Sequence, residues 1–205
     1  MIDEKPTIEV GGQDEPPEYP RYYYEAARRL LSVPDGNLKD VALPIIYLQR
    51  HCLELIIKEL HLASLYLAAG KRMAAEDTLV TPERPPSKHQ LLDIMKGLQD
   101  SFKEQHLDLP VDLEAFAQYM DRLEKSSPDR YRYAYESWKK EDKNRGIAPK
   151  ESFPNVESLP LRAIQGRLES LVRTVDFRDS DSLVMQMYRA LTVVHPEIHL
   201  PADTD

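Results

Sequence analysis

The amino-acid sequence predicts an all-α protein, a single-domain bundle of five to six helices around one long central helix. Apolar residues recur at helical spacing along most of the chain, and no stretch sustains the alternation and β-branched enrichment of a strand. A length of 205 residues suits one domain with a sizeable core. The stretch IIYLQRHCLELIIKELH, residues 45–61, is apolar around most of its circumference, which places it at the centre of the bundle.

The first half of the chain predicts two helices. The first covers residues 19–32, YPRYYYEAARRLLS, and the turn sequence PDG ends it. The second and longest covers residues 40–69, where Pro44 is tolerated because it lies near the helix start. Gly70 suits the left-handed position that follows a helix end, so we expect the long helix to stop there.

Four shorter helices should follow. The third begins within SKHQLLDIMKGLQDSFKEQH, where Ser87 and Gln90 have the spacing of a capping box. The fourth starts after Pro110 in PVDLEAFAQYMDRLEK. The last two are LPLRAIQGRLESLVRTV and SLVMQMYRALTVV, and Pro196 stops the second of these at His195.

Composition divides the remaining chain into a leader, a loop and a tail. Residues 1–18 form an acidic, proline-rich leader that should be disordered, and residues 196–205 form a flexible tail. Between them, the domain of residues 19–195 contains a long basic loop at about 126–159. The net charge of −8 argues against binding nucleic acid by an overall positive field, but residues 130–150 carry a local charge of +4.

Several classes of protein are disfavoured by what the sequence lacks. A single cysteine, Cys52, leaves no internal disulfide, and the first residues, MIDEKPTIEV, do not resemble a signal peptide. No segment approaches the length of about 20 apolar residues needed to cross a bilayer. There is also no glycine-rich phosphate loop, nucleophile elbow or cysteine pair. We therefore expect a cytoplasmic protein without a membrane segment, metal or cofactor.

Two groups of polar residues stand out from this helical background. Arg50, His51, Glu54, Lys58 and His61 share one narrow side of the long apolar helix. They form either a solvated row of helical ion pairs or the edge of a cleft, and Lys58 argues against a metal site. The loop sequence DRYRYAYESWKK, residues 129–140, alternates arginine with tyrosine, as single-stranded nucleic acid binders do. Alternatively, buried tyrosines simply pin this loop to the bundle.

Together these motifs resemble the bacterial HEPN domains, the higher eukaryote and prokaryote nucleotide-binding family. The resemblance lies in LQRHCLELIIKELH, in KHQLLDIMKGL at the start of the next helix, and in RYRY in the late loop. It extends over about residues 19–195 and implies a helical bundle that is commonly a homodimer. Many members of that family are metal-independent endoribonucleases of toxin, abortive-infection or phage-defence systems, and others are catalytically silent binding modules.

The resemblance implies two sets of functional side chains. The catalytic set is Arg50, His51, Glu54, Lys58 and Arg132, and the RNA-binding set is His89, Arg130, Tyr131 and Tyr133. The family's usual motif of Arg and His four to six residues apart also occurs, in the pairs Arg84 with His89 and Arg189 with His195. We keep Arg189 and His195 in reserve, because Ala190 replaces the polar residue that often follows the arginine.

A metal-free ribonuclease would use these side chains for acid-base chemistry. A neutral histidine can take the proton of a ribose 2′-hydroxyl or give one to the leaving oxygen, and we expect His51 to do so. An arginine would clamp the phosphate, Glu54 would orient His51 or Arg50, and Lys58 would add positive potential. In the structural alternative, Arg50 and Glu54 form an ion pair whose only role is to stabilise the packing of the long helix.

Three hypotheses follow for the function. The first is a HEPN-like metal-independent endoribonuclease of a toxin or phage-defence type system. The second is a catalytically silent HEPN-like module that binds RNA, a nucleotide or a partner protein, such as an antitoxin or a defence-system subunit. The third is an unrelated helical structural or regulatory protein. A histidine and an arginine that converge on one point of an open cleft would favour the enzyme.

Overall fold

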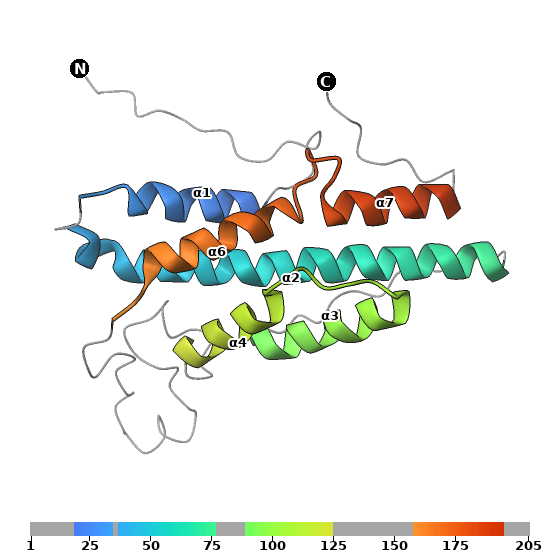
Figure 1. Ribbon diagram of the computed structural model, residues 1–205, viewed down its shortest axis with the longest axis horizontal. Helices are drawn as coiled ribbons and strands as arrows, with labels where there is room; N and C mark the ends of the chain where they lie inside the picture. The colour runs from blue at the N-terminus through green and yellow to red at the C-terminus, as the bar shows by residue number, and fades with distance from the viewer. Residues whose placement is uncertain (1–18, 35–36, 77–88, 125–157, 195–205) are drawn as a thin grey trace, which may run out of the picture.

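The structure is a helical bundle, as the sequence predicts. The computed structural model describes residues 19–34, 37–76, 89–124 and 158–194, and within these ranges every regular element is a helix (Figure 1). The helices are α1 (Tyr19–Leu31), α2 (Leu38–Glu76), α3 (Leu91–Gln105), α4 (Leu113–Glu124), α6 (Leu161–Arg173) and α7 (Leu183–Val194). The prediction of an all-α bundle with one long helix is confirmed.

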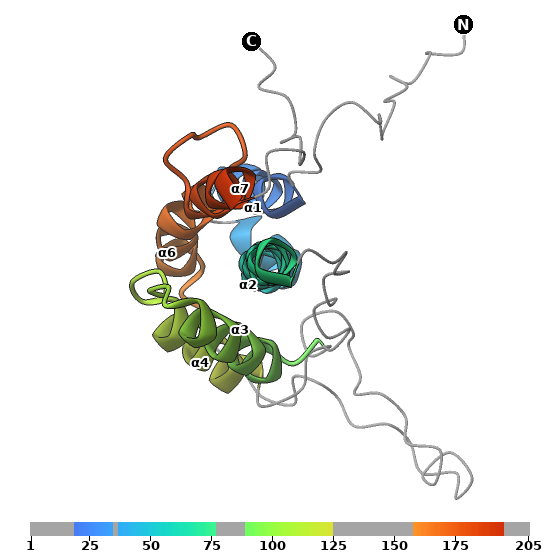
Figure 2. The same ribbon diagram turned by 90° about the vertical axis from the view of Figure 1, so that its right-hand side faces the viewer.

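Helix α2 is the axis of the bundle. Viewed nearly along α2, the other helices surround it on several sides, with α1 and α7 above, α6 to one side, and α3 and α4 below (Figure 2). Its apolar residues at helical spacing, including Ile46, Leu53, Ile57 and Leu60, are fully buried. A helix that is apolar around most of its circumference needs neighbours on most sides, and α1, α3, α6 and α7 supply them.

Helix α1 forms an antiparallel hairpin with the first half of α2. The thiol of Cys52 donates a hydrogen bond to the carbonyl of Pro20, with a sulfur–oxygen distance of 3.2 Å. One turn along α1, the ring of Tyr23 packs on the ring of His51. Because α1 runs opposite to α2, its first turn lies beside residues 52–55 of α2.

Helix α3 runs parallel to α2. The ring of His61 packs against Gly97, and one turn further along both helices the hydroxyls of Ser64 and Ser101 lie 2.7 Å apart. Both contacts advance in the same direction along the two helices. The start of α3 therefore lies beside the middle of α2, where the polar residues predicted from the sequence occur.

A buried amide network attaches α6 and α1 to α2. The Gln49 side-chain nitrogen donates to the carbonyl of Leu161, at 2.8 Å, and to Gln165, at 3.0 Å. Gln165 in turn donates to the carbonyl of Tyr24 in α1, at 3.1 Å. These bonds supply partners for amide groups that would be costly to bury alone.

Two local predictions were wrong. The long helix does not end at Ala69 but continues through Gly70 to Glu76. Gly70 lacks a side chain because α7 packs closely there, and an added Cβ would overlap Leu191. At the start of α3, Gln90 is the N-cap but makes no capping hydrogen bond with its side chain. Its predicted capping-box partner, Ser87, lies outside the described residues.

The predicted leader and tail, and nearly all of the basic loop, lie outside the described residues. Within the described part of the chain, no helix combines the length and apolar character needed to cross a membrane.

Two glycine substitutions should affect stability in opposite directions. Gly70→Ala introduces a methyl group against buried Leu191, and we expect a loss of about 1 to 2 kcal/mol in the free energy of unfolding. Gly166→Ala, inside α6, meets nothing within 4 Å and should gain up to about 1 kcal/mol from helix propensity. Urea denaturation of both variants measures the difference, and a Gly70→Ala protein as stable as the Gly166→Ala protein would contradict the proposed packing.

Candidate functional site

The buried carboxylate of Glu54 is the centre of a polar cluster on α2. Its side chain is 1% exposed. Lys58 Nζ lies 2.6 Å from Glu54 Oε1, and Nδ1 of His89 lies 2.8 Å from the same oxygen. The other oxygen, Oε2, pairs with Arg50 Nη1 and lies 3.7 Å from Nδ1 of His51. We call these five residues the Glu54 cluster.

Helical spacing explains how four members of the cluster meet. Arg50, Glu54 and Lys58 are four residues apart, so they lie in one row along α2. His51, three residues before Glu54, joins the row from the side. His89 comes from a different segment, just before α3, and reaches Glu54 because α3 starts beside the middle of α2.

The guanidinium group of Arg50 connects α2 to α4 and to the segment just before α3. Its Nε donates to Glu124 Oε1 at 2.6 Å, its Nη1 to Glu54, and its Nη2 to the main-chain carbonyl of His89. Glu124 is the last residue of α4. The side chains of Arg50, Glu54 and Glu124 are all at least 96% buried. Every nitrogen of Arg50 is engaged, so this arginine holds the bundle together and is not free to clamp a phosphate.

Burial and neighbouring charges shift the two carboxyl groups in opposite directions. Burial alone would raise the pKa of Glu54, but contacts with His51 and Lys58 and the charge of Arg50 hold that pKa well below its usual range. Burial raises the pKa of Glu124 to about 7, although the neighbouring charge of Arg50 acts in the opposite direction. The lowered pKa of Glu54 keeps this carboxylate ionised at all physiological pH values.

An ionised Glu54 determines how the histidines are protonated. A carboxylate can only accept hydrogen bonds, so the Nδ1 atom of His89 that lies 2.8 Å away must carry a proton. Nε2 of this ring has no hydrogen-bond partner among the described residues, and the same is true of His51. Within the described part of the chain, the Glu54 cluster thus leaves two imidazole nitrogens without a hydrogen-bond partner.

Three members of the cluster are accessible to solvent. The side chains of His51 and Lys58 are each 23% exposed, and that of His89 is 67% exposed. His51 lies between two tyrosines: its ring centroid is 4.5 Å from that of Tyr23, edge to face, and 5.9 Å from that of Tyr47, nearly parallel. The accessible side of the site therefore combines imidazole, ammonium and aromatic groups.

The other residues predicted from the sequence lie elsewhere. His61 is buried against Gly97, its Nδ1 has no hydrogen-bond partner within the described ranges, and burial lowers its pKa. Arg189 is exposed on α7. Six predicted residues lie outside the described part of the chain: Arg84, Arg130, Tyr131, Arg132, Tyr133 and His195.

Sequence reasoning missed Glu124, although a signal for it exists. The buried residues of α4 are Leu113, Phe116, Ala117, Met120 and Glu124, which follow helical spacing along one face. A carboxylate on an otherwise apolar face needs a buried cation. The pattern therefore predicts an ion pair for Glu124, but it does not identify Arg50 as the partner.

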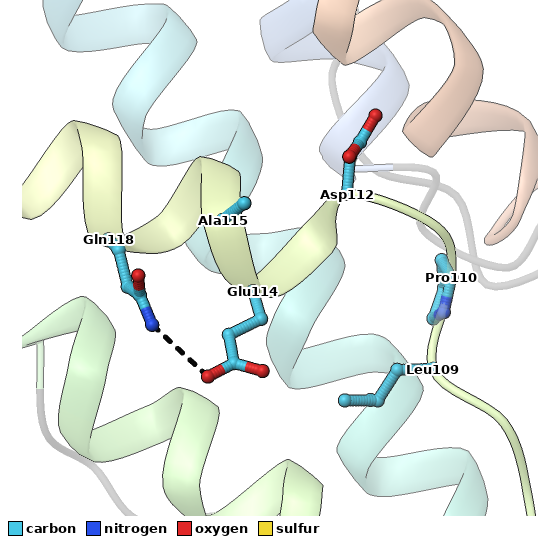
Figure 3. A pocket seen from close by; sticks show the side chains of 6 residues that line it. All are labelled: Leu109, Pro110, Asp112, Glu114, Ala115 and Gln118. Carbon is cyan, nitrogen blue, oxygen red and sulfur yellow. Dashed lines mark hydrogen bonds between the residues drawn. The ribbon is translucent and has the colours of Figure 1, made fainter.

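Pockets formed by described residues also occur away from the Glu54 cluster. One, of about 340 Å³, lies at the start of α4, where Gln118 donates to Glu114 and Leu109 and Pro110 form the opposite wall (Figure 3). Another, of about 590 Å³, lies where the end of α1 meets the starts of α2 and α6. Neither is lined by a member of the Glu54 cluster. Within the described residues, no three His, Cys, Asp or Glu side chains are placed to hold a metal ion.

No protein-family model, curated protein or solved structure matches this chain. The resemblance to HEPN domains therefore depends on the sequence motifs alone.

The raised pKa of Glu124 predicts a pH-dependent contribution to stability. Its folded pKa of about 7 exceeds the ordinary value of 4.5, so its contribution is fully present below about pH 4.5 and is lost as the pH rises through about 7. Glu124→Gln carries no charge and can still accept from Arg50. The free energy of unfolding of this variant, relative to that of the wild type, should rise by on the order of 2 kcal/mol as the pH increases from about 4.5 to about 8. Urea denaturation at each pH measures this difference.

The control for this experiment is Glu114→Gln, the same chemical change at an exposed position of the same helix, which leaves the contact between Arg50 and Glu124 in place. If the stability of Glu124→Gln relative to the wild type stays constant or falls as the pH rises, Glu124 is ionised throughout and the proposed effect of burial is refuted.

Proposed function

We propose that this protein is a metal-independent endoribonuclease that uses His51 and His89 as its acid-base pair. The observation that supports this most directly is that both imidazoles present Nδ1 to one buried carboxylate, Glu54. A carboxylate behind each ring favours the tautomer in which Nε2 accepts a proton and stabilises the imidazolium that forms. Two oriented histidines beside a lysine are sufficient groups for cleaving a phosphodiester next to a 2′-hydroxyl.

The proposed reaction is an internal transesterification. One histidine takes the proton of the 2′-hydroxyl, and the resulting oxygen nucleophile forms a bond to phosphorus. The bond from phosphorus to the 5′-oxygen breaks, and the second histidine protonates that oxygen. The products are a 2′,3′-cyclic phosphate and a 5′-hydroxyl, so protons and electrons balance without a metal or co-reactant.

The remaining members of the cluster take supporting roles in this proposal. Lys58 replaces Arg50 as the cation that stabilises the developing negative charge, because Lys58 is partly exposed and Arg50 is buried. Arg50 and Glu124 hold the main chain of His89 and the end of α4 in place. Arg130 and Arg132 remain proposed phosphate ligands, as the family resemblance implies.

One observation favours the alternative, a catalytically silent module that binds RNA, a nucleotide or a partner protein. The ion pairs among Arg50, Glu54 and Glu124 form a closed and buried network. Such a network holds the helices together whether or not the neighbouring side chains are catalytic. In both proposals the protein acts as a cytoplasmic homodimer in a toxin or phage-defence type system.

Cleavage assays with single variants test the enzyme proposal. His51→Ala and His89→Ala should each lower the rate of cleavage of purified cellular RNA by about 100-fold or more, because general acid-base catalysis typically contributes that much. His89 is 67% exposed, so His89→Ala should change the melting temperature little. His51→Ala loses ring contacts with Tyr23 and Tyr47, so it should lower the melting temperature while leaving the domain folded at the assay temperature. EDTA should not inhibit the wild-type protein, and gel analysis should show 2′,3′-cyclic phosphate ends.

Two matched controls are His106→Asn, at an exposed histidine, and Lys71→Ala, at an exposed lysine of α2. Asparagine is chosen because His106 has a left-handed backbone, with φ of 57°. Both controls should cleave like the wild type. If the folded wild-type protein cleaves no RNA, the silent module becomes the better account, and if cleavage persists in both His51→Ala and His89→Ala, the assigned site is wrong.

A further inference from the structure

Two tyrosines contact the Glu54 cluster, and two more lie in the adjoining first turns of α1. Tyr23 and Tyr47 flank the ring of His51, as described above. Tyr19 and Tyr22, in the same first turns of α1, are each 52% exposed. Single exposed aromatic residues are common, but here they adjoin a site that already contains two aromatic rings and two imidazoles.

The direction of α1 places these tyrosines along the site. The whole length of α1 lies against α2 (Figure 1). The hydrogen bond from the Cys52 thiol to the Pro20 carbonyl sets the antiparallel register of the two helices. Because Tyr23 is beside His51, the preceding turn, which starts at Tyr19, lies further along α2 in the direction of Lys58. The aromatic groups therefore follow the same edge as the proposed catalytic groups.

We propose that Tyr19 and Tyr22, continuing from Tyr23, form a stacking subsite for unpaired nucleobases, so that the substrate is single-stranded RNA. This inference rests on the proposed function and names the form of RNA that the site accepts. Exposed rings offer faces to bases, and Lys58 with the two histidines offers cations to the phosphates. Bases in a duplex are already stacked and paired, so they cannot use such rings.

Packing alone does not account for Tyr19 and Tyr22. Tyr23 and Tyr47 have a structural role, since they enclose His51, but about half the surface of Tyr19 and Tyr22 remains open to solvent. A protein partner could also cover exposed tyrosines. We favour RNA because the first turns of α1 carry exposed rings and the adjacent stretch of α2 carries Lys58, so aromatic faces for bases and a cation for phosphates occur on neighbouring helices.

Binding of three non-cleavable probes tests the subsite. The probes are a labelled 12-nucleotide 2′-O-methyl RNA of mixed sequence, the same RNA in a duplex with its complement, and an abasic sugar-phosphate chain of equal length. The 2′-O-methyl group removes the nucleophile, so fluorescence anisotropy reports binding without cleavage. The variants are Tyr19→Ala/Tyr22→Ala, Tyr19→Phe/Tyr22→Phe, the single change Tyr22→Ser, and a control, Tyr66→Ala, at an exposed tyrosine of α2.

The Tyr19→Ala/Tyr22→Ala protein should bind the single strand about tenfold more weakly or worse, since aromatic stacking is lost for at least one base. Tyr22→Ser should show a smaller loss in the same direction, and it serves as the test if the double variant does not fold. The phenylalanine variant, which keeps both rings, should bind within about twofold of the wild type, as should Tyr66→Ala. The wild type should prefer the single strand to both the duplex and the abasic chain.

The outcomes separate this inference from the proposed function. Equal single-strand affinity for the alanine, serine and wild-type proteins overturns the subsite, even if the wild type cleaves RNA. An equal loss with the abasic chain, or with Tyr66→Ala, overturns it as well. Tyrosine-dependent binding without any cleavage supports the subsite and rejects the nuclease. A wild-type protein that binds none of the probes overturns the subsite, and if it also cleaves no RNA, the nuclease is overturned as well and a protein partner becomes the ligand of this surface.

Discussion

The buried guanidinium of Arg50 is the constraint on which the rest of the site depends. A charge that is almost completely removed from water must be matched by opposite charge and hydrogen bonds. Glu54 supplies the charge, and Glu54, Glu124 and the carbonyl of His89 accept the hydrogen bonds of Arg50. Each partner comes from a different part of the chain. Removing one partner of such a buried pair typically costs about 3 to 5 kcal/mol. Satisfying one side chain therefore fixes the end of α4 and the start of α3 against α2.

The same network gives Glu54 two roles that are usually separate. One of its oxygens neutralises Arg50 inside the bundle, while the other contacts Lys58 and His89 at the accessible edge. The carboxylate is therefore part of the core and also the group that orients the imidazoles. In the proposed enzyme, the stability of the bundle and the protonation of the histidines depend on the same ionised side chain. In the silent alternative, only the first of these roles is used.

Features that depend on residues close together in the sequence, such as the extent of α1, were predicted correctly. Features that depend on contacts between distant residues were not. The predicted helix of residues 19–32 closely matches α1, because its amphipathic period and the turn that follows are local features. The end of α2 was misplaced because Gly70 is required by close packing against Leu191 and does not end the helix. Leu191 lies more than a hundred residues away in the sequence, on α7. Helical spacing indicated that Arg50, His51, Glu54 and Lys58 share one side, but not that Arg50 is buried, since its partner Glu124 is 74 residues away.

The position of the ring protons on His51 and His89 tests the central claim, that one buried and ionised carboxylate orients both imidazoles. Free neutral histidine can carry its proton on either nitrogen, and the nitrogen shifts in a long-range proton–nitrogen NMR correlation spectrum distinguish the two tautomers. When both rings are neutral, the account predicts that each holds its proton on Nδ1, facing Glu54, with Nε2 unprotonated. A proton on Nε2 of both rings would show that Glu54 does not accept from them and would contradict the account.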